Sequence, residues 1–226
     1  MSITHSHHYC FALISLILGF GYTAQAHAST NFDSFFADFG FGYREVNSGI
    51  SSSLSVNGTP IPSTLSSGQP ANIVSAFTFG YNLPIHSVFK LGIGANIAPA
   101  SGQAQQIQVQ ARNQEVSLPG IKPLYNYGFF LAPSLVIGDG LAYLKVGSQT
   151  QVNNSNTSPN FNGYLLGVGY KQLVSQSIYI FGEADYGSYS AQTSSRTVSS
   201  SGRSINASVT TKPQGSRYLI GVGYQF

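Results

Sequence analysis

The sequence has no tryptophan, and Cys10 and Met1 are its only cysteine and methionine. A chain with a single cysteine cannot form an internal disulfide or a thiolate metal site, so both are excluded. Charged residues make up 8% of the chain, against about 25% in an ordinary soluble protein. The formal net charge of +3 is too small to indicate a nucleic-acid partner.

Long apolar runs are also missing after residue 28, where no stretch reaches the length of about 18 residues that a membrane-spanning helix needs. Before that point, Phe11–Phe20 has the length of a secretory apolar core, and small residues follow at Ala24, Ala26 and Ala28. We therefore predict a signal peptide over residues 1–28, cleaved after Ala28, and export through the general secretory pathway. A membrane anchor is the alternative, but the apolar core is too short to span about 30 Å of hydrocarbon.

The rest of the chain alternates between apolar and polar residues with period two, which predicts β-strands with one apolar face. Eight segments show this pattern, namely residues 35–45, 72–82, 88–98, 124–136, 141–149, 161–171, 178–188 and the C-terminal segment from Arg217 onward. The connections between them are alternately short and long, which is typical of barrels with short periplasmic turns and long external loops. The sequence predicts an all-β fold, with residues 29–226 forming one transmembrane antiparallel up-and-down barrel.

Several local features refine this prediction. A two-residue turn at Gly138-Asp139 or Asp139-Gly140 joins two segments whose outward faces then agree. Pro133 lacks a ladder donor, so we expect a bulge or an early strand end there. Asn57-Gly58 is a hairpin signal in the first long connection. A two-residue turn there mismatches the facing of the strands around it, so a bulge or irregular loop must intervene.

Alternation also occurs inside two of the long connections, near residues 107–111 and 205–209, and predicts strands that extend above the membrane. A ten-stranded barrel is the alternative, but these segments are too polar to face lipid. Glycines recur at inward positions and leave space for long side chains from other strands. Tyrosine and phenylalanine form two interfacial belts. The external belt comprises Tyr43, Tyr125, Tyr164, Tyr186 and Tyr218, and the periplasmic belt Tyr81, Phe89, Tyr170, Tyr224 and Phe226.

The C-terminal segment is the most specific motif, with apolar or aromatic residues at Tyr218, Ile220, Val222, Tyr224 and Phe226. With the eight alternating segments, it makes the chain resemble the small eight-stranded outer-membrane proteins of Gram-negative bacteria, the group of the OmpA transmembrane domain, OmpX and the opacity proteins. The resemblance implies a bacterial outer-membrane location. It also implies that the barrel-assembly machinery reads this last strand.

Inward-facing charges are the first candidate site, and they are Asp38, Arg44, Lys90, Lys145, Lys171, Glu183, Asp185 and Arg217. An eight-stranded barrel is just wide enough to be filled by side chains, so we favour a structural ion-pair network. The alternative is a gate that opens to a narrow pore. The second candidate is the set of loop charges, which are Glu45, Arg112, Glu115, Lys122, Arg196, Arg203 and Lys212. Their net positive charge suits lipopolysaccharide phosphates or acidic host glycans, although a solvated rim is the simpler interpretation.

Catalysis is not expected. His86 is the only histidine after residue 28 and lies in a predicted periplasmic turn, whereas a barrel-embedded lipid A deacylase would carry its Ser-His-acid triad near the outer leaflet. We therefore expect no cofactor and no metal. The resemblance implies a monomeric, non-enzymatic surface protein that serves envelope integrity, adhesion or host interaction. A low-conductance channel is the main alternative, and a lipid-modifying enzyme is the least favoured.

Overall fold

The computed structural model describes residues 32–56, 59–61, 64–67, 72–99, 105–111, 114–121, 123–153, 160–200 and 203–226. The predicted signal peptide and its cleavage site lie outside these residues. The described strands are β1 (Phe35–Val56), β2 (Thr59–Ile61), β3 (Thr64–Ser67), β4 (Asn72–Pro84), β5 (Phe89–Pro99), β6 (Gln105–Ala111), β7 (Gln114–Ile121), β8 (Pro123–Ile137), β9 (Gly140–Asn153), β10 (Phe161–Leu173), β11 (Ile178–Tyr189), β12 (Gln192–Ser200) and β13 (Arg203–Gln225). The described part of the chain contains no helix of the length and apolarity that a membrane crossing requires.

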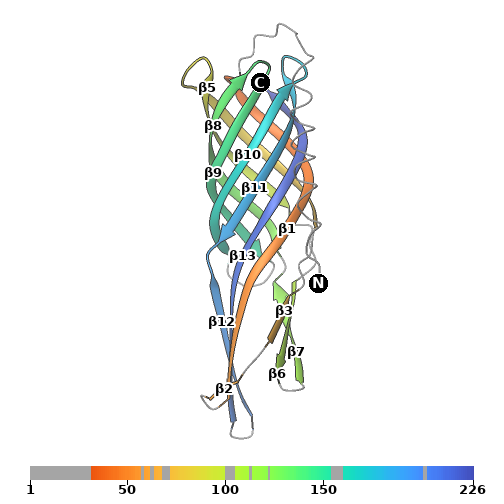
Figure 1. Ribbon diagram of the computed structural model, residues 1–226, viewed down its shortest axis with the longest axis vertical. Coiled ribbons are helices and arrows are strands. Elements are labelled where there is room, and N and C mark those ends of the chain that lie inside the picture. The colour runs from red at the N-terminus through yellow and green to blue at the C-terminus, as the bar shows by residue number, and fades with distance from the viewer. Residues whose placement is uncertain are drawn as a thin grey trace, which may run out of the picture.

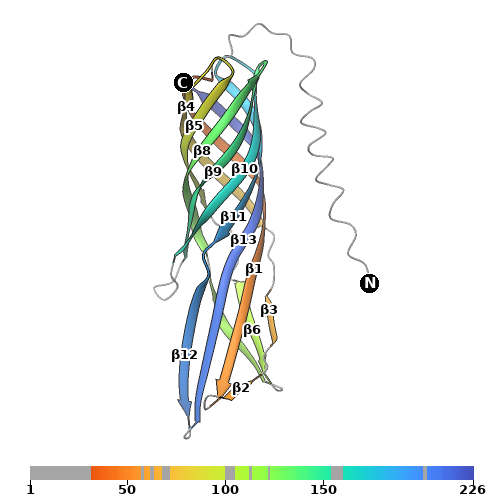
Figure 2. The ribbon, with the colours of Figure 1, turned by 60° about the vertical axis from the view of Figure 1, so that its left-hand side comes forward.

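Eight of these strands form a closed antiparallel barrel in the order β1, β4, β5, β8, β9, β10, β11 and β13, and β13 pairs back with β1. The predicted eight-stranded, up-and-down fold is therefore confirmed. Short connections at residues 85–88, 138–139 and 174–177 lie at the same end as the C-terminus, here called the turn end. The opposite end, the loop end, carries the long hairpins (Figures 1 and 2).

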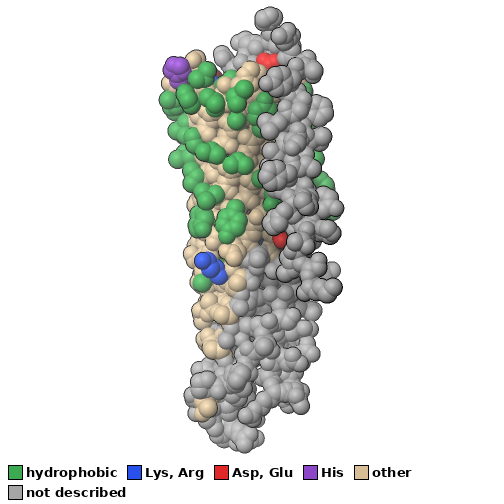
Figure 3. Space-filling model, viewed as in Figure 1, with side chains coloured by type: hydrophobic (Ala, Val, Ile, Leu, Met, Phe, Trp, Pro, Cys, Tyr) green, Lys and Arg blue, Asp and Glu red, His purple; other side chains and the backbone are tan. Residues whose placement is uncertain are grey.

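The predicted facing of the strands is confirmed by burial. Along each strand, exposed apolar side chains alternate with buried ones, as the pleat requires. Phe129 is 64% exposed beside Phe130 at 6%, and Ile220 is 62% exposed beside Leu219 at 4%. The outward residues form a continuous apolar surface around the barrel, part of which is visible in Figure 3.

The turn between β8 and β9 has the first of the two predicted positions. Ile137 pairs with Gly140, so Gly138 and Asp139 form the two-residue turn. Gly138 has φ of 58°, a left-handed conformation in which glycine has no Cβ penalty.

The prediction of a bulge or early strand end at Pro133 is wrong. β8 continues to Ile137, and Pro133 pairs with Leu91 of β5 in regular register. On the β9 side the ladder passes from Leu131–Val146 to Ser134–Tyr143 without a change of register. The missing donor therefore interrupts the ladder on the β9 side only, and β8 is paired with both neighbouring strands before and after this gap. A register irregularity occurs instead at the loop end of β8, between Pro123 and Tyr125.

At the loop end, β1 and β13 continue far beyond the barrel, paired without interruption as far as Val56 and Ile205. The barrel strands were predicted to end at residue 45 and to begin at Arg217. The further strand predicted near residues 205–209 is confirmed, because β13 runs through it. Residues 46–56 of β1 were not predicted as a strand, because they are rich in serine and lack a regular apolar alternation. β12 (Gln192–Ser200), which the sequence analysis missed, pairs with residues 203–211 of β13. We call the sheet of β12, residues 203–212 of β13 and residues 45–56 of β1 the blade.

The long connections near residues 46–71 and 99–123 also contain strands. β3, β6 and β7 form a separate three-stranded sheet, so the predicted strand near residues 107–111 is confirmed. Val56 of β1 pairs with Thr59 of β2 across Asn57-Gly58, two residues that lie outside the described ranges. The β1–β2 register differs by one residue from the β1–β4 register. The predicted facing mismatch is therefore real, and the chain accommodates it by leaving the barrel sheet between β2 and β4.

Candidate functional site

Aromatic side chains fill the lumen by lying over the inward glycines of other strands. A Cβ atom on Gly169 would lie 2.3 Å from Cζ of Tyr143, and one on Gly223 would lie 2.3 Å from Cζ of Tyr179. Gly94 stands in the same relation to Phe130. These glycines therefore leave room for rings from other strands, as the sequence predicts.

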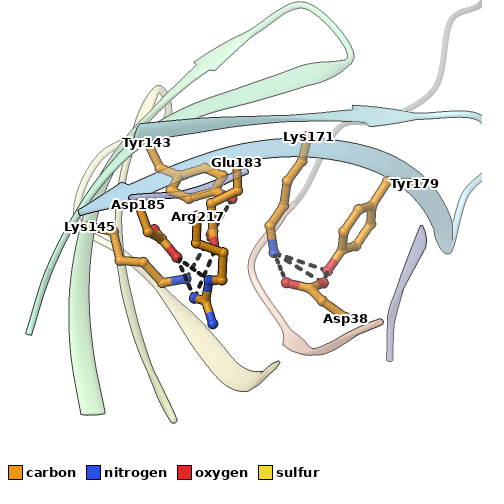
Figure 4. Close-up of polar contacts among 8 residues, drawn as sticks. All are labelled: Asp38, Tyr143, Lys145, Lys171, Tyr179, Glu183, Asp185 and Arg217. Atoms are coloured by element: carbon orange, nitrogen blue, oxygen red, sulfur yellow. Dashed lines mark hydrogen bonds and ion pairs between the residues drawn. The ribbon is translucent and has the colours of Figure 1, made fainter. Parts of the chain in front are cut away.

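Asp38 on β1 and Lys171 on β10 are joined across the lumen, although their strands are not neighbours (Figure 4). Nζ of Lys171 donates to Oδ2 of Asp38 at 3.0 Å and to the hydroxyl oxygen of Tyr179 at 3.0 Å. The Tyr179 hydroxyl in turn donates to Asp38. The ammonium also lies 3.7 Å from the ring centroid of Phe36, a cation–π contact. Two polar partners and a ring thus compensate for the burial of this lysine.

A second group of charges crosses the lumen nearer the loop end, from β9 to β13 (Figure 4). Nζ of Lys145 lies 2.7 Å from Oε2 of Glu183, which also accepts a 2.8 Å hydrogen bond from the Tyr143 hydroxyl. Arg217 pairs with Asp185 and lies 3.8 Å from Oε1 of Glu183. Lys145, Glu183, Arg217 and Asp185 therefore form one continuous chain of ion pairs, here called the bridge.

Lys90 is paired with a residue that the sequence analysis did not select. Its buried ammonium forms an ion pair with Asp33, which precedes the first strand. The adjacent Ser34 carbonyl accepts a 3.1 Å hydrogen bond from the backbone N–H of Asn82 on β4. Asp33 lies outside the alternating pattern, so only the presence of an inward lysine in need of a partner could have indicated it.

Arg44 occupies a different situation at the loop end. It stands directly opposite Arg217 in the β1–β13 ladder, where like charges repel. Its guanidinium donates to Oε1 of Gln151 at 3.3 Å, and Gln151 donates to Asn153 at 3.0 Å. Within the described ranges, no carboxylate forms an ion pair with Arg44. The structure thus joins seven of the eight predicted lumen charges in ion pairs and holds the eighth by an amide.

Two cavities lie on opposite sides of the bridge and share no lining residue. The one toward the turn end is bordered by Asp38, Tyr143, Lys145 and Glu183. The one toward the loop end is bordered by Arg44, Asn126, Asp185 and Arg217. The bridge therefore contributes to the walls of both cavities and stands between them.

The predicted assembly strand is the part of β13 that closes the barrel wall between β11 and β1. Its five apolar and aromatic residues are exposed, and the rings of Tyr224 and Phe226 lie 5.0 Å apart. With the outward residues of the other strands they form the apolar surface described above. A closed barrel with such a surface suits a lipid bilayer, because closure leaves no open sheet edge whose N–H and C=O groups would face lipid.

His86 is exposed in the turn at residues 85–88, with its Nδ1 atom 3.1 Å from Oγ of Ser87. It lies at the turn end, and the long hairpins lie at the opposite end of the barrel. In the ranges that the structure describes, no group of three His, Cys, Asp or Glu side chains is placed to hold a metal ion.

No family model matches the chain, and no curated protein sequence does so either. Solved structures do match. The outer membrane protein OprG from Pseudomonas aeruginosa is 17% identical, with a TM-score of 0.55, over 85% of this chain and 96% of that one. This chain has the fold of a small outer-membrane β-barrel. Neisserial surface protein A is 9% identical over 85% of this chain and 97% of its own, with a TM-score of 0.47. The outer membrane protease OmpT from Escherichia coli is 10% identical over 88% and 98%, with a TM-score of 0.44.

Proposed function

We propose that this protein is a monomeric, non-enzymatic barrel of the bacterial outer membrane, closed by its own side chains, that acts through the structures at its loop end. The bridge is the observation that carries this proposal. Lys145, Glu183, Arg217 and Asp185 reach from β9 to β13 between two separate cavities. A water-filled channel would need these side chains to move apart, and breaking a buried ion pair costs about 3–5 kcal/mol.

The placement in the outer membrane is supported by three observations. The exposed apolar surface encircles the barrel, the pairing of β13 with β1 closes the eight strands into a cylinder without open edges, and the fold matches that of OprG. In this placement the turn end faces the periplasm, and β13 is the strand that the barrel-assembly machinery would read. The blade and the β3–β6–β7 sheet then face outward, where they serve adhesion, host contact or envelope integrity.

A low-conductance channel is the second candidate, and a specific contact favours it. Glu183 lies against both Lys145 and Arg217, at 2.7 Å and 3.8 Å. A carboxylate shared between two cations can exchange one partner for the other without ever being left unpaired. Such an exchange would let the bridge open and connect the two cavities at a smaller cost than that of breaking one isolated pair.

The deciding experiment is single-channel recording of the refolded chain, residues 29–226, in a planar bilayer, with protease resistance used to confirm insertion. We expect a silent bilayer for the wild-type protein. Glu183→Gln removes the shared carboxylate, and Glu45→Gln is its matched control because Glu45 is exposed on β1 beyond the barrel. Discrete steps in the wild type that change in Glu183→Gln but not in Glu45→Gln would establish a channel and overturn the closed lumen.

A further inference from the structure

We propose that the outward face of the blade binds the sugar–phosphate headgroups of the glycolipid in the surrounding outer leaflet. This inference rests on the proposed placement in an outer membrane. It does not depend on whether the lumen is closed. These headgroups are the first groups that the loop end meets, directly above the apolar surface.

Two rows of hydroxyl groups cross the blade. In the first row, Oγ1 of Thr193 and Oγ1 of Thr210 are 2.8 Å apart, and Ser51 pairs with Thr210 from the other side. In the second row, Ser195 donates to Ser208 at 3.1 Å, and Ser53 pairs with Ser208. Residues paired across a ladder lie on the same face of a sheet, so three strands together present six hydroxyls.

This face continues the lipid-facing side of the barrel. The β1–β13 register is unbroken from the turn end to the tip, so even-numbered residues of β13 stay on one side. That side carries Ile220 and Tyr218 in the apolar surface and Thr210 and Ser208 in the hydroxyl rows. The bilayer surface and the hydroxyl rows are therefore one continuous face of one strand.

The order of side chains along this face follows the chemistry of a phosphorylated glycolipid. Tyr218 ends the apolar surface, and next to it the Tyr186 hydroxyl donates to Oε1 of Gln214 at 3.0 Å. The exposed Lys212 comes next, and then the hydroxyl rows begin at Thr210. Acyl chains, phosphates and sugars follow in the same order away from the centre of an outer leaflet. On the visible face, hydrophobic side chains over the barrel are followed toward the loop end by a Lys or Arg side chain and then by an area of other side chains and backbone (Figure 3).

The residue types suit sugars better than they suit a protein partner. A hydroxyl both donates and accepts, so a row of hydroxyls can match the hydroxyls of a saccharide without a fixed charge pattern. Protein interfaces depend instead on large buried anchors such as Trp, Tyr and Arg. The six residues of the hydroxyl rows are all serine or threonine. Lys212 supplies a positive charge at the level where the phosphates lie.

The test measures the binding of two glycolipids to the detergent-solubilised, refolded barrel by native mass spectrometry. One probe is lipid A, a phosphorylated disaccharide lipid that lacks the core sugars, and the other is lipopolysaccharide with a complete core oligosaccharide. We expect the wild type to bind the core-bearing glycolipid more tightly than lipid A. Thr193→Val with Thr210→Val removes one hydroxyl row while retaining strand-forming residues. It should lower the preference for the core about fivefold, as expected for the loss of about one net hydrogen bond.

Lys212→Gln should weaken the binding of both glycolipids about threefold and leave the core preference unchanged, because it removes a charge that meets phosphate. Ser87→Ala, an exposed hydroxyl variant at the turn end, is the matched control and should change neither value. A heat-dependent shift of gel mobility confirms that each variant is folded. Equal wild-type binding of the two probes, or a core preference that survives the double valine variant, overturns the proposal. Conductance of the barrel would overturn the closed lumen and leave these binding ratios unaffected.

Discussion

The ring of Phe32 lies edge-on to the ring of Tyr179, with the ring centroids 6.2 Å apart. Phe32 is only 1% exposed, although it precedes the first strand. Asp33 follows it and pairs with the buried Lys90, and Ser34 is tied to β4 by a backbone hydrogen bond. The segment ahead of β1 is therefore part of the packing of the lumen at the turn end.

Phe32→Ala should lower the free energy of unfolding by about 3–5 kcal/mol, because it leaves a cavity against Tyr179 in a buried aromatic cluster. Urea unfolding in phospholipid vesicles, followed by circular dichroism, measures the change. Ile85→Ala removes an exposed side chain at the same end and should alter stability by less than about 0.5 kcal/mol. Equal effects of the two variants would mean that Phe32 does not pack in the lumen.

The pair of Asp38 and Lys171 should behave as one unit. Lys171→Met removes the cation from the Asp38 carboxylate and leaves the Tyr179 hydroxyl as its donor among the contacts described above. It should cost about 3–5 kcal/mol of stability. Asp38→Asn combined with Lys171→Met removes both charges and should be less destabilising than the sum of the two single variants. The same unfolding assay gives all four corners of the double-mutant cycle. Strict additivity would show that the two charges are not coupled.

Gly169→Ala should destabilise the barrel by about 1–3 kcal/mol, because its new Cβ overlaps the ring of Tyr143 and forces the ring away from Glu183. Gly49→Ala is the matched control. Its Cβ would approach no atom closer than 3.8 Å, and Gly49 lies in the exposed part of β1. A neutral or stabilising effect is expected there. Comparable losses in the two variants would point to general strand effects in place of ring packing.

Gly138→Ala should cost about 1 kcal/mol, since φ of 58° places an ordinary residue in the unfavourable left-handed region. A Cβ there would meet no atom within 4 Å, so the cost is conformational and not steric crowding with neighbours. Gly138→Asn should recover most of the loss, because asparagine tolerates this conformation. Thermal unfolding of the three proteins compares them directly. An asparagine variant as unstable as the alanine variant would contradict this account.

The sequence predicts the barrel well because lipid and lumen impose opposite chemistry on alternate residues. Phe129 beside Phe130 shows the limit of this signal, since both are apolar and only the register of their neighbours assigns one to each face. The blade was harder to predict. Beyond the apolar surface the outward positions carry serine and threonine, so β12 has no apolar alternation to mark it as a strand.

The lumen charges could be assigned to the interior from parity, but their partners could not. Pairing depends on which strands face each other across the barrel and on how far each strand is staggered. The alternation of apolar and polar residues along a strand gives information on neither. Lys171 therefore meets Asp38 from a strand 133 residues away in sequence. The prediction of a bulge or strand end at Pro133 was wrong for a related reason. The sequence does not show how firmly the neighbouring strands hold a residue that lacks a hydrogen-bond donor.

The pairing of β1 with β13 joins the first strand of the barrel to the last. The cylinder can therefore close only after β13 is available, since Ala37, which pairs with Phe79 of β4 on one side, has Tyr224 of β13 as its partner on the other. A chain that stops before the final strand keeps two open sheet edges with unpaired N–H and C=O groups, which lipid cannot satisfy. Closure thus makes folding in the membrane depend on chain completion, and prematurely terminated chains should be left exposed to periplasmic proteases.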